Sequence, residues 1–213
     1  MNRLFGLDSP VMAFLSRLAD LIWLNLLTLL CCIPVITAGA AFTALHYVCI
    51  KMVRDEDGYL TKSYFKSFKQ NFLQATGMWL LFLLAALIMV ADFFFVFRME
   101  GDFVFILQVA LSAVSLFLVC SLLYWLPLLS RFENTVLHTI KNAFLVSILN
   151  FPRTLAILVI YGAFLFFYWM FSIRILPLIL LMGISLPVYL ASYLFSAVFK
   201  KLEPSEEEIS QSV

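Results

Sequence analysis

Few side chains in this 213-residue sequence have the type and spacing that chemistry requires. His46 and Cys49 stand three residues apart, a spacing that puts two potential metal ligands on one helical face. Two ligands make a poor metal site, and neither His46 nor His138 belongs to an HExxH arrangement. The cysteines, all in apolar stretches and without a CxxC pair, are Cys31, Cys32, Cys49 and Cys120. We interpret them as buried thiols and predict no metal site and no cofactor.

Arrangements for catalysis or energy coupling are also missing from the sequence. Covalent or acid–base catalysis needs a nucleophile beside a base, or paired carboxylates, and His46 has no third partner in its apolar stretch. The seven glycines are scattered singly, so there is no phosphate-binding loop of the Walker type. No series of Asp, Glu and His suits a proton relay. We predict that the protein is not an enzyme and that a partner supplies any energy it uses.

The elements that must position these side chains are strongly apolar. Hydrophobic residues make up 64% of the sequence and charged residues 13%, about half of the usual share. The net charge of +1 leaves no global basic surface for nucleic acid. A bilayer core about 30 Å thick needs about 20 apolar residues per helix, so the chain has room for up to about six spans. The composition therefore predicts an all-α membrane protein.

Six apolar stretches in the sequence are long enough to be transmembrane helices. Two further segments repeat apolar residues, aromatic ones in the first segment, at three- and four-residue steps with polar and basic residues opposite, a pattern typical of amphipathic helices on a membrane surface. Together they predict a single transmembrane domain over residues 1–200. Within it we expect spans at 11–34, 37–53, 75–97, 103–129, 154–172 and 175–199 and surface helices at 60–73 and 134–150, followed by a polar cytoplasmic tail at 201–213.

The positions of Lys and Arg predict how the chain is oriented, because these residues concentrate in cytoplasmic loops. With six spans and the N-terminus inside, twelve of the fourteen basic residues lie on the cytoplasmic side, and only Arg98 and Arg174 lie outside. If residues 37–53 did not cross, keeping the basic residues of 51–69 inside would place the N-terminus outside. The charge pattern therefore favours six crossings with both termini in the cytoplasm.

Residues 37–53 are rich in small side chains, which recur at four-residue spacing at 37/41 and 40/44. Such spacing lets a neighbouring helix approach closely. A packed interior helix and a re-entrant pore loop both fit this pattern, and both place the segment inside the protein. In the first span, two polar residues three apart are expected to hydrogen-bond between helices. The candidate helix-packing or partner contacts are Asn25, Thr28, Pro34, Thr37, Gly39, Ala40, Ala41 and Ala44.

The two amphipathic segments form a candidate cytoplasmic interaction surface. Each Lys near an anionic membrane contributes about 1 kcal/mol of attraction, although ordinary topology anchors have the same composition. Shifted by 72 residues, the two segments align with identical residues in three places, which leaves open a degenerate parallel repeat. The residues of this surface are Lys62, Lys66, Lys69, Phe65, Phe68, Phe72, Lys141 and Phe144.

Three stretches carry a resemblance to a known family. They are ADLIWLNLLTLLCCIPVITAGAAFTALHYVCIKMVRDEDGYLTKSYFKSFKQNF (residues 19–72), RFENTVLHTIKNAFL (131–145) and NFPRTL (150–155). The chain resembles the YesL family of bacterial membrane proteins, which is defined as a domain of unknown function, over about residues 1–200. Proteins of this family are often encoded beside ABC importers for oligosaccharides, so the resemblance implies an accessory role in carbohydrate uptake in the bacterial cytoplasmic membrane. It supplies no catalytic residue.

Three functional hypotheses follow. The first is an accessory or scaffolding subunit in the lipid bilayer that packs against the permease or ATPase of a carbohydrate ABC importer. The lack of energy-coupling and catalytic motifs favours it. The alternative is a small stand-alone transporter or channel, which the break at Pro34 and the degenerate repeat favour. The third is a sensor whose basic aromatic helices bind anionic lipid or a cytoplasmic partner.

Overall fold

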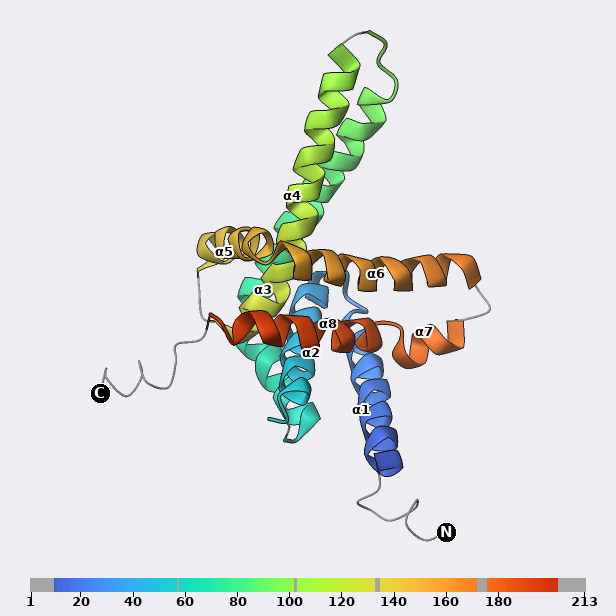
Figure 1. The fold of residues 1–213 in the computed structure, drawn as a ribbon, viewed down its shortest axis with the longest axis vertical. Helices are drawn as coiled ribbons and strands as arrows, with labels where there is room; N and C mark the ends of the chain where they lie inside the picture. The colour runs from blue at the N-terminus through green and yellow to red at the C-terminus, as the bar shows by residue number, and fades with distance from the viewer. Residues whose placement is uncertain (1–9, 57, 102, 133–134, 172–175, 203–213) are drawn as a thin grey trace, which may run out of the picture.

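The computed structural model of the chain describes residues 10–56, 58–101, 103–132, 135–171 and 176–202 (Figure 1). Of the predicted polar tail at 201–213, residues 203–213 lie outside the described residues, as does the start of the predicted span at 175–199.

All regular structure in the described part of the chain is helical, which confirms the predicted all-α fold class. Five helices are long and apolar enough to cross a membrane, and there are up to six spans if the bent pair α7–α8 counts as one. The elements are α1 (Pro10–Cys31), the 3₁₀ helix η1 (Val35–Thr37), α2 (Ala38–Val53), α3 (Leu60–Val96), α4 (Phe103–Arg131), α5 (Val136–Leu149), α6 (Phe151–Phe171), α7 (Leu176–Met182) and α8 (Ser185–Phe199).

Helix α2 is the element around which the others pack. It contacts α1, α3, α4 and α8, and 67% of its apolar window is buried, against 22% or less in the other four long helices. Its small side chains Ala40, Ala41 and Ala44 have no exposed surface. Small residues let neighbouring backbones approach closely, so the sequence of α2 suits this central position.

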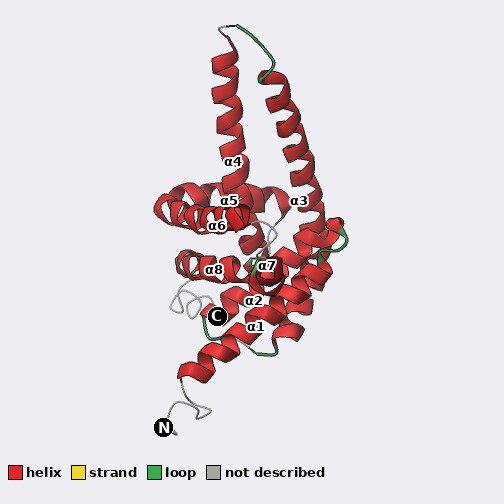
Figure 2. Cartoon of the chain, turned by 90° about the vertical axis from the view of Figure 1, so that its right-hand side faces the viewer, coloured by secondary structure: helices red, strands yellow, loops and turns green. Residues whose placement is uncertain are grey.

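Helices α3 and α4 form a long hairpin that projects from the rest of the molecule (Figure 1). Helices α6 and α8 pack side by side and run across this hairpin. Figure 2 shows them nearly end-on while the hairpin stays upright. Helices that cross in this way cannot all lie along one membrane normal. The six-crossing topology with both termini inside stays a prediction.

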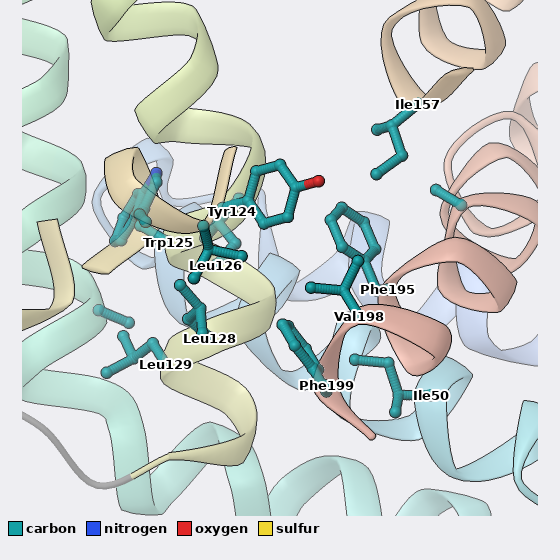
Figure 3. Packing of buried hydrophobic residues seen from close by; sticks show 14 of the residues in the cluster. Ile50, Tyr124, Trp125, Leu126, Leu128, Leu129, Ile157, Phe195, Val198 and Phe199 are labelled. Carbon is teal, nitrogen blue, oxygen red and sulfur yellow. The ribbon is translucent and has the colours of Figure 1, made fainter. Parts of the chain in front are cut away.

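The core between α4, α6 and α8 is built from aromatic and branched side chains (Figure 3). The Tyr124 ring meets the Phe195 ring edge-on, with 5.3 Å between centroids, and the Phe195 and Phe199 rings stack at 6.1 Å. The Tyr124 hydroxyl and the Thr154 hydroxyl are 2.9 Å apart, so the buried phenol has a hydrogen-bond partner on α6. This core fixes α8 against α4 and α6.

The structure joins two segments that the sequence separates. Residues 60–73, predicted as a surface helix, and residues 75–97, predicted as a span, form the single 37-residue helix α3. No Gly or Pro lies between residues 60 and 76, so nothing interrupts the backbone hydrogen bonds at the junction. Separating these two segments was therefore wrong.

The other predicted helices lie close to observed ones, and their boundaries differ by a few residues or by a break. The first span, predicted at 11–34, ends at Cys31, because Pro34 has no N–H with which to continue a helix. The predicted surface helix at 134–150 corresponds to α5, which packs against α4, and the spans at 103–129 and 154–172 correspond to α4 and α6. The predicted span at 175–199 is divided by a break into α7 and α8, which are bent by 44°.

Polar contacts gather at one end of α2. In the turn that follows this helix, Asp55 accepts a 2.9 Å bond from Arg17 of α1, and Glu56 lies 3.2 Å from Arg131 of α4. The Arg54 side chain, only 5% exposed, donates to the Ser196 hydroxyl of α8 at 3.0 Å. This turn therefore links three other helices, and it lies at the opposite end of the molecule from the tip of the α3–α4 hairpin (Figure 1).

Candidate functional site

The break between α7 and α8 follows from two residues spaced four apart, Gly183 and Pro187. An α-helix needs the N–H of residue 187 to reach the carbonyl of residue 183, and Pro187 has no N–H. A Cβ atom on Gly183 would lie 2.6 Å from the Ile179 carbonyl oxygen, so only glycine fits here. The sequence therefore breaks the helix at this point and leaves backbone groups in need of partners.

Asn25 of α1 supplies most of these partners. Its side-chain nitrogen donates to the carbonyls of Ile179 and Leu180, at 3.2 and 2.7 Å. Its side-chain oxygen accepts the N–H groups of Ile184 and Ser185, at 2.8 and 3.0 Å. The residue has no exposed surface. One buried amide thus satisfies the carbonyl end of α7 and the N–H end of α8 together.

Tyr168 of α6 supplies the remaining partner. Its hydroxyl donates to the carbonyl of Gly183 at 2.6 Å, which is the carbonyl that Pro187 leaves without an intrahelical bond. The broken helix is therefore held from two sides, by α1 and by α6. Interrupted helices whose freed backbone groups face a cavity form the binding sites of many transporters.

A cavity of about 470 Å³ adjoins this break. Residues of α2, α3, α4, α6 and the α7–α8 break line it, and the lining is almost entirely apolar. Its aromatic members are Phe42, Trp79, Tyr161, Phe164 and Tyr168. Cavities of this size hold small molecules, and an apolar lining selects apolar ones. A second hollow, around Tyr59 and Phe65, is a shallow surface depression outside the helix core.

His46 is a buried lining residue with unused hydrogen-bonding capacity. Its side chain is 4% exposed, its Nδ1 has no partner in the described part of the chain, and its ring meets Phe195 edge-on at 5.7 Å. By contrast, the Trp79 indole donates to the Val35 carbonyl at 2.9 Å. The His46–Cys49 pair gains no third ligand, because no group of three metal-binding side chains occurs among the described residues.

Thr28 and Thr37 make local bonds. The Thr28 hydroxyl donates to the Leu24 carbonyl of its own helix at 2.7 Å and lies beside the Tyr64 hydroxyl of α3. The Thr37 hydroxyl donates to the carbonyls of Cys31 and Pro34, at 2.6 and 2.8 Å, and thereby closes the turn between α1 and α2.

The small residues predicted as packing contacts lie at the interfaces of α2. A Cβ on Gly39 would stand 2.5 Å from the Trp79 Cβ and 2.6 Å from the Ala75 carbonyl oxygen of α3. The Tyr64 hydroxyl donates to the Ala41 carbonyl at 3.2 Å. Ala40 belongs to one buried hydrophobic cluster and Ala44 to the other. These positions contact other helices of the same chain.

In the predicted cytoplasmic surface, most of the aromatic residues pack against other residues and the lysines are exposed. Among its aromatic residues, Phe68 and Phe72 pack against the core, and Phe144 meets Phe117 with 4.3 Å between ring centroids, whereas Phe65 is 39% exposed. The four lysines Lys62, Lys66, Lys69 and Lys141 are exposed.

Gly183, Pro187 and Tyr168 belong to the site although the sequence reasoning did not select them. A glycine followed four residues later by a proline was the available signal, because that spacing both removes a helical bond and tolerates a tight turn. Tyr168 carries no comparable local signal.

Comparison with known proteins gives one match. A family model described as "Protein of unknown function, DUF624" matches residues 21–93, about a third of the chain, from α1 through α2 into α3. This segment is similar to that family, whose description assigns no activity. No curated protein and no solved structure matches the chain.

Proposed function

We propose that the protein is a non-enzymatic membrane subunit that packs its α3–α4 hairpin against the membrane-spanning helices of a carbohydrate ABC importer. It works in the bacterial cytoplasmic membrane, with both termini inside, as a YesL-like protein. The choice of a carbohydrate importer rests on the resemblance of residues 19–72 and later segments to that family. The apolar cavity supports an accessory role, because a sugar needs several hydrogen-bonding groups that this lining does not offer.

The projecting hairpin is the observation that carries the proposal (Figure 2). The apolar window of α3 is buried by 6% and that of α4 by 0%, so the rest of the chain leaves much of their surface uncovered. Lipid alone satisfies such a surface, but exposed Ala110 and Ala113 form a small-residue face on α4 on which another helix can pack closely. Asp92 of α3 makes no ion pair with any described residue, and carboxylates within membrane segments usually face a partner group.

Purification from native membranes tests this proposal. The tagged protein, extracted in a mild detergent, is expected to carry the permease and ATPase subunits of a sugar importer with it. Ala113→Phe places a bulky ring on the small-residue face and is expected to reduce this recovery several-fold, because the partner helix can no longer approach. Val159→Phe is the matched control, since Val159 is 62% exposed on α6, away from the hairpin. Recovery at background level, or equal loss in both variants, would contradict the proposal.

The Asn25-bridged break beside the cavity favours a second candidate function, a small stand-alone transporter. This candidate predicts flux of a small labelled solute with an apolar body into liposomes that contain the protein alone. It also predicts loss of that flux in Asn25→Leu and its retention in Thr28→Val, because Asn25 bonds to the break and Thr28 does not bond to its described residues. Equal leakage in protein-free liposomes would remove this candidate.

A further inference from the structure

The cavity between α2, α4, α6 and the α7–α8 break has properties that the accessory role does not use. Buried side chains form one part of its lining, among them His46, Leu126 and Val188. Leu165 of α6, also in the lining, is 66% exposed. The cavity is therefore partly open on the α6 side, where an apolar helix faces the surroundings of the protein.

The apolar lining excludes water and sugars as its natural contents. An apolar cavity of this kind stays dry or takes up apolar molecules, because water and sugars need several polar partners. A molecule that enters past Leu165 comes from the surface of α6, which in a membrane is surrounded by hydrocarbon. The most suitable occupant is thus a hydrocarbon body that dissolves in the membrane.

His46 adds one polar requirement. A buried ring nitrogen without a partner costs free energy, and the other nitrogen-bearing ring of the lining, Trp79, already donates to Val35. The Tyr168 hydroxyl is likewise engaged, with Gly183. A hydroxyl group can satisfy His46 in either tautomer, because it both donates and accepts a hydrogen bond.

We infer that this cavity is a binding site for a membrane-soluble hydrocarbon that carries one hydroxyl group, which hydrogen-bonds to His46. The site is independent of the hairpin surface proposed above. Its occupant also contacts the α7–α8 break through Gly183 and Ile184, which belong to the lining. Binding therefore stabilises the arrangement of the break that Asn25 and Tyr168 hold.

Photolabelling of the full chain in lipid nanodiscs tests this inference. The probe is a twelve-carbon primary alcohol with a diazirine in its chain, and labelled peptides are identified by mass spectrometry. We expect saturable labelling of the lining segments 122–126 and 161–168. Excess dodecanol is expected to compete about two- to tenfold more effectively than dodecane, since one hydrogen bond distinguishes the two competitors. This comparison needs no variant of the protein.

Two comparisons, one between two variants and one between a variant and the wild type, test the location of the site and the role of His46. Leu123→Trp fills the cavity and is expected to abolish the saturable labelling, while Leu116→Trp, at a position 59% exposed on the same helix, leaves it unchanged. In His46→Phe, dodecanol and dodecane are expected to compete equally, whereas the wild type distinguishes them. Labelling that does not saturate, or that persists in folded Leu123→Trp, would overturn the site. Equal competition by the alcohol and the alkane in the wild type would overturn the role of His46.

Discussion

Replacing Asn25 by Leu is expected to lower the free energy of unfolding by about 2–5 kcal/mol. The substitution removes four hydrogen bonds and leaves the Leu180 carbonyl and the N–H groups of Ile184 and Ser185 without the partner that Asn25 supplies, while the Ile179 carbonyl keeps its bond from the Gly183 N–H. Titration with SDS of the protein in detergent micelles, followed by circular dichroism, measures this change.

Thr28→Val is the matched control for this substitution. Thr28 lies one turn away on α1 and is equally buried, but its hydroxyl donates to the Leu24 carbonyl of its own helix and makes no hydrogen bond with the described residues of the break. We expect a cost below about 1 kcal/mol, because the carbonyl also accepts the backbone N–H of residue 28. Equal destabilisation by the two substitutions would contradict the role of Asn25 at the break.

Gly39→Ala and Gly77→Ala are expected to change stability in opposite directions. Alanine at Gly39 is expected to cost about 1–3 kcal/mol by overpacking, because its Cβ would lie 2.5 Å from the Trp79 Cβ and 2.6 Å from a backbone oxygen of α3. Alanine at Gly77 meets no atom within 4 Å and is expected to stabilise α3 by up to about 1 kcal/mol. The same SDS titration measures both.

The test depends on whether Gly39→Ala and Gly77→Ala change the free energy of unfolding in opposite directions. Both residues are glycines inside helices, so helix propensity alone favours alanine at each position. Only the close approach of α2 to α3 makes Gly39 an exception. Stabilisation by both substitutions would show that the two helices do not approach as closely as the structure has them.

Composition and periodicity predict the helical class and most helix positions, because the bilayer sets the length of an apolar helix. They do not predict how helices cross. Helices α6 and α8 are as apolar as α3 and α4, yet they run across that hairpin (Figure 1). Their direction depends on packing between residues far apart in sequence, such as Tyr124 with Phe195, for which one sequence has no local signal.

Asn25 and Thr28 also show that one sequence does not predict which polar residue bonds to a distant part of the chain. Both are polar residues deep in the first span, and the sequence predicts an interhelical role for each. Asn25 bonds to residues more than 150 positions away, whereas the hydroxyl of Thr28 donates to a carbonyl one turn back in its own helix. A short side chain with a nearby carbonyl forms the local bond first, and a longer amide reaches another helix.

Site-specific photocrosslinking from the hairpin tests the proposed function most directly. A benzoylphenylalanine at Ile106 of α4, which is 63% exposed and lies two turns from Ala113 on the same face, and another at Phe166 of α6, which is 59% exposed, would be irradiated in native membranes. We predict that position 106 crosslinks to the permease of a sugar importer and that position 166 does not. Crosslinks from position 106 to lipid alone would contradict the proposal that the α3–α4 hairpin is a partner-binding surface.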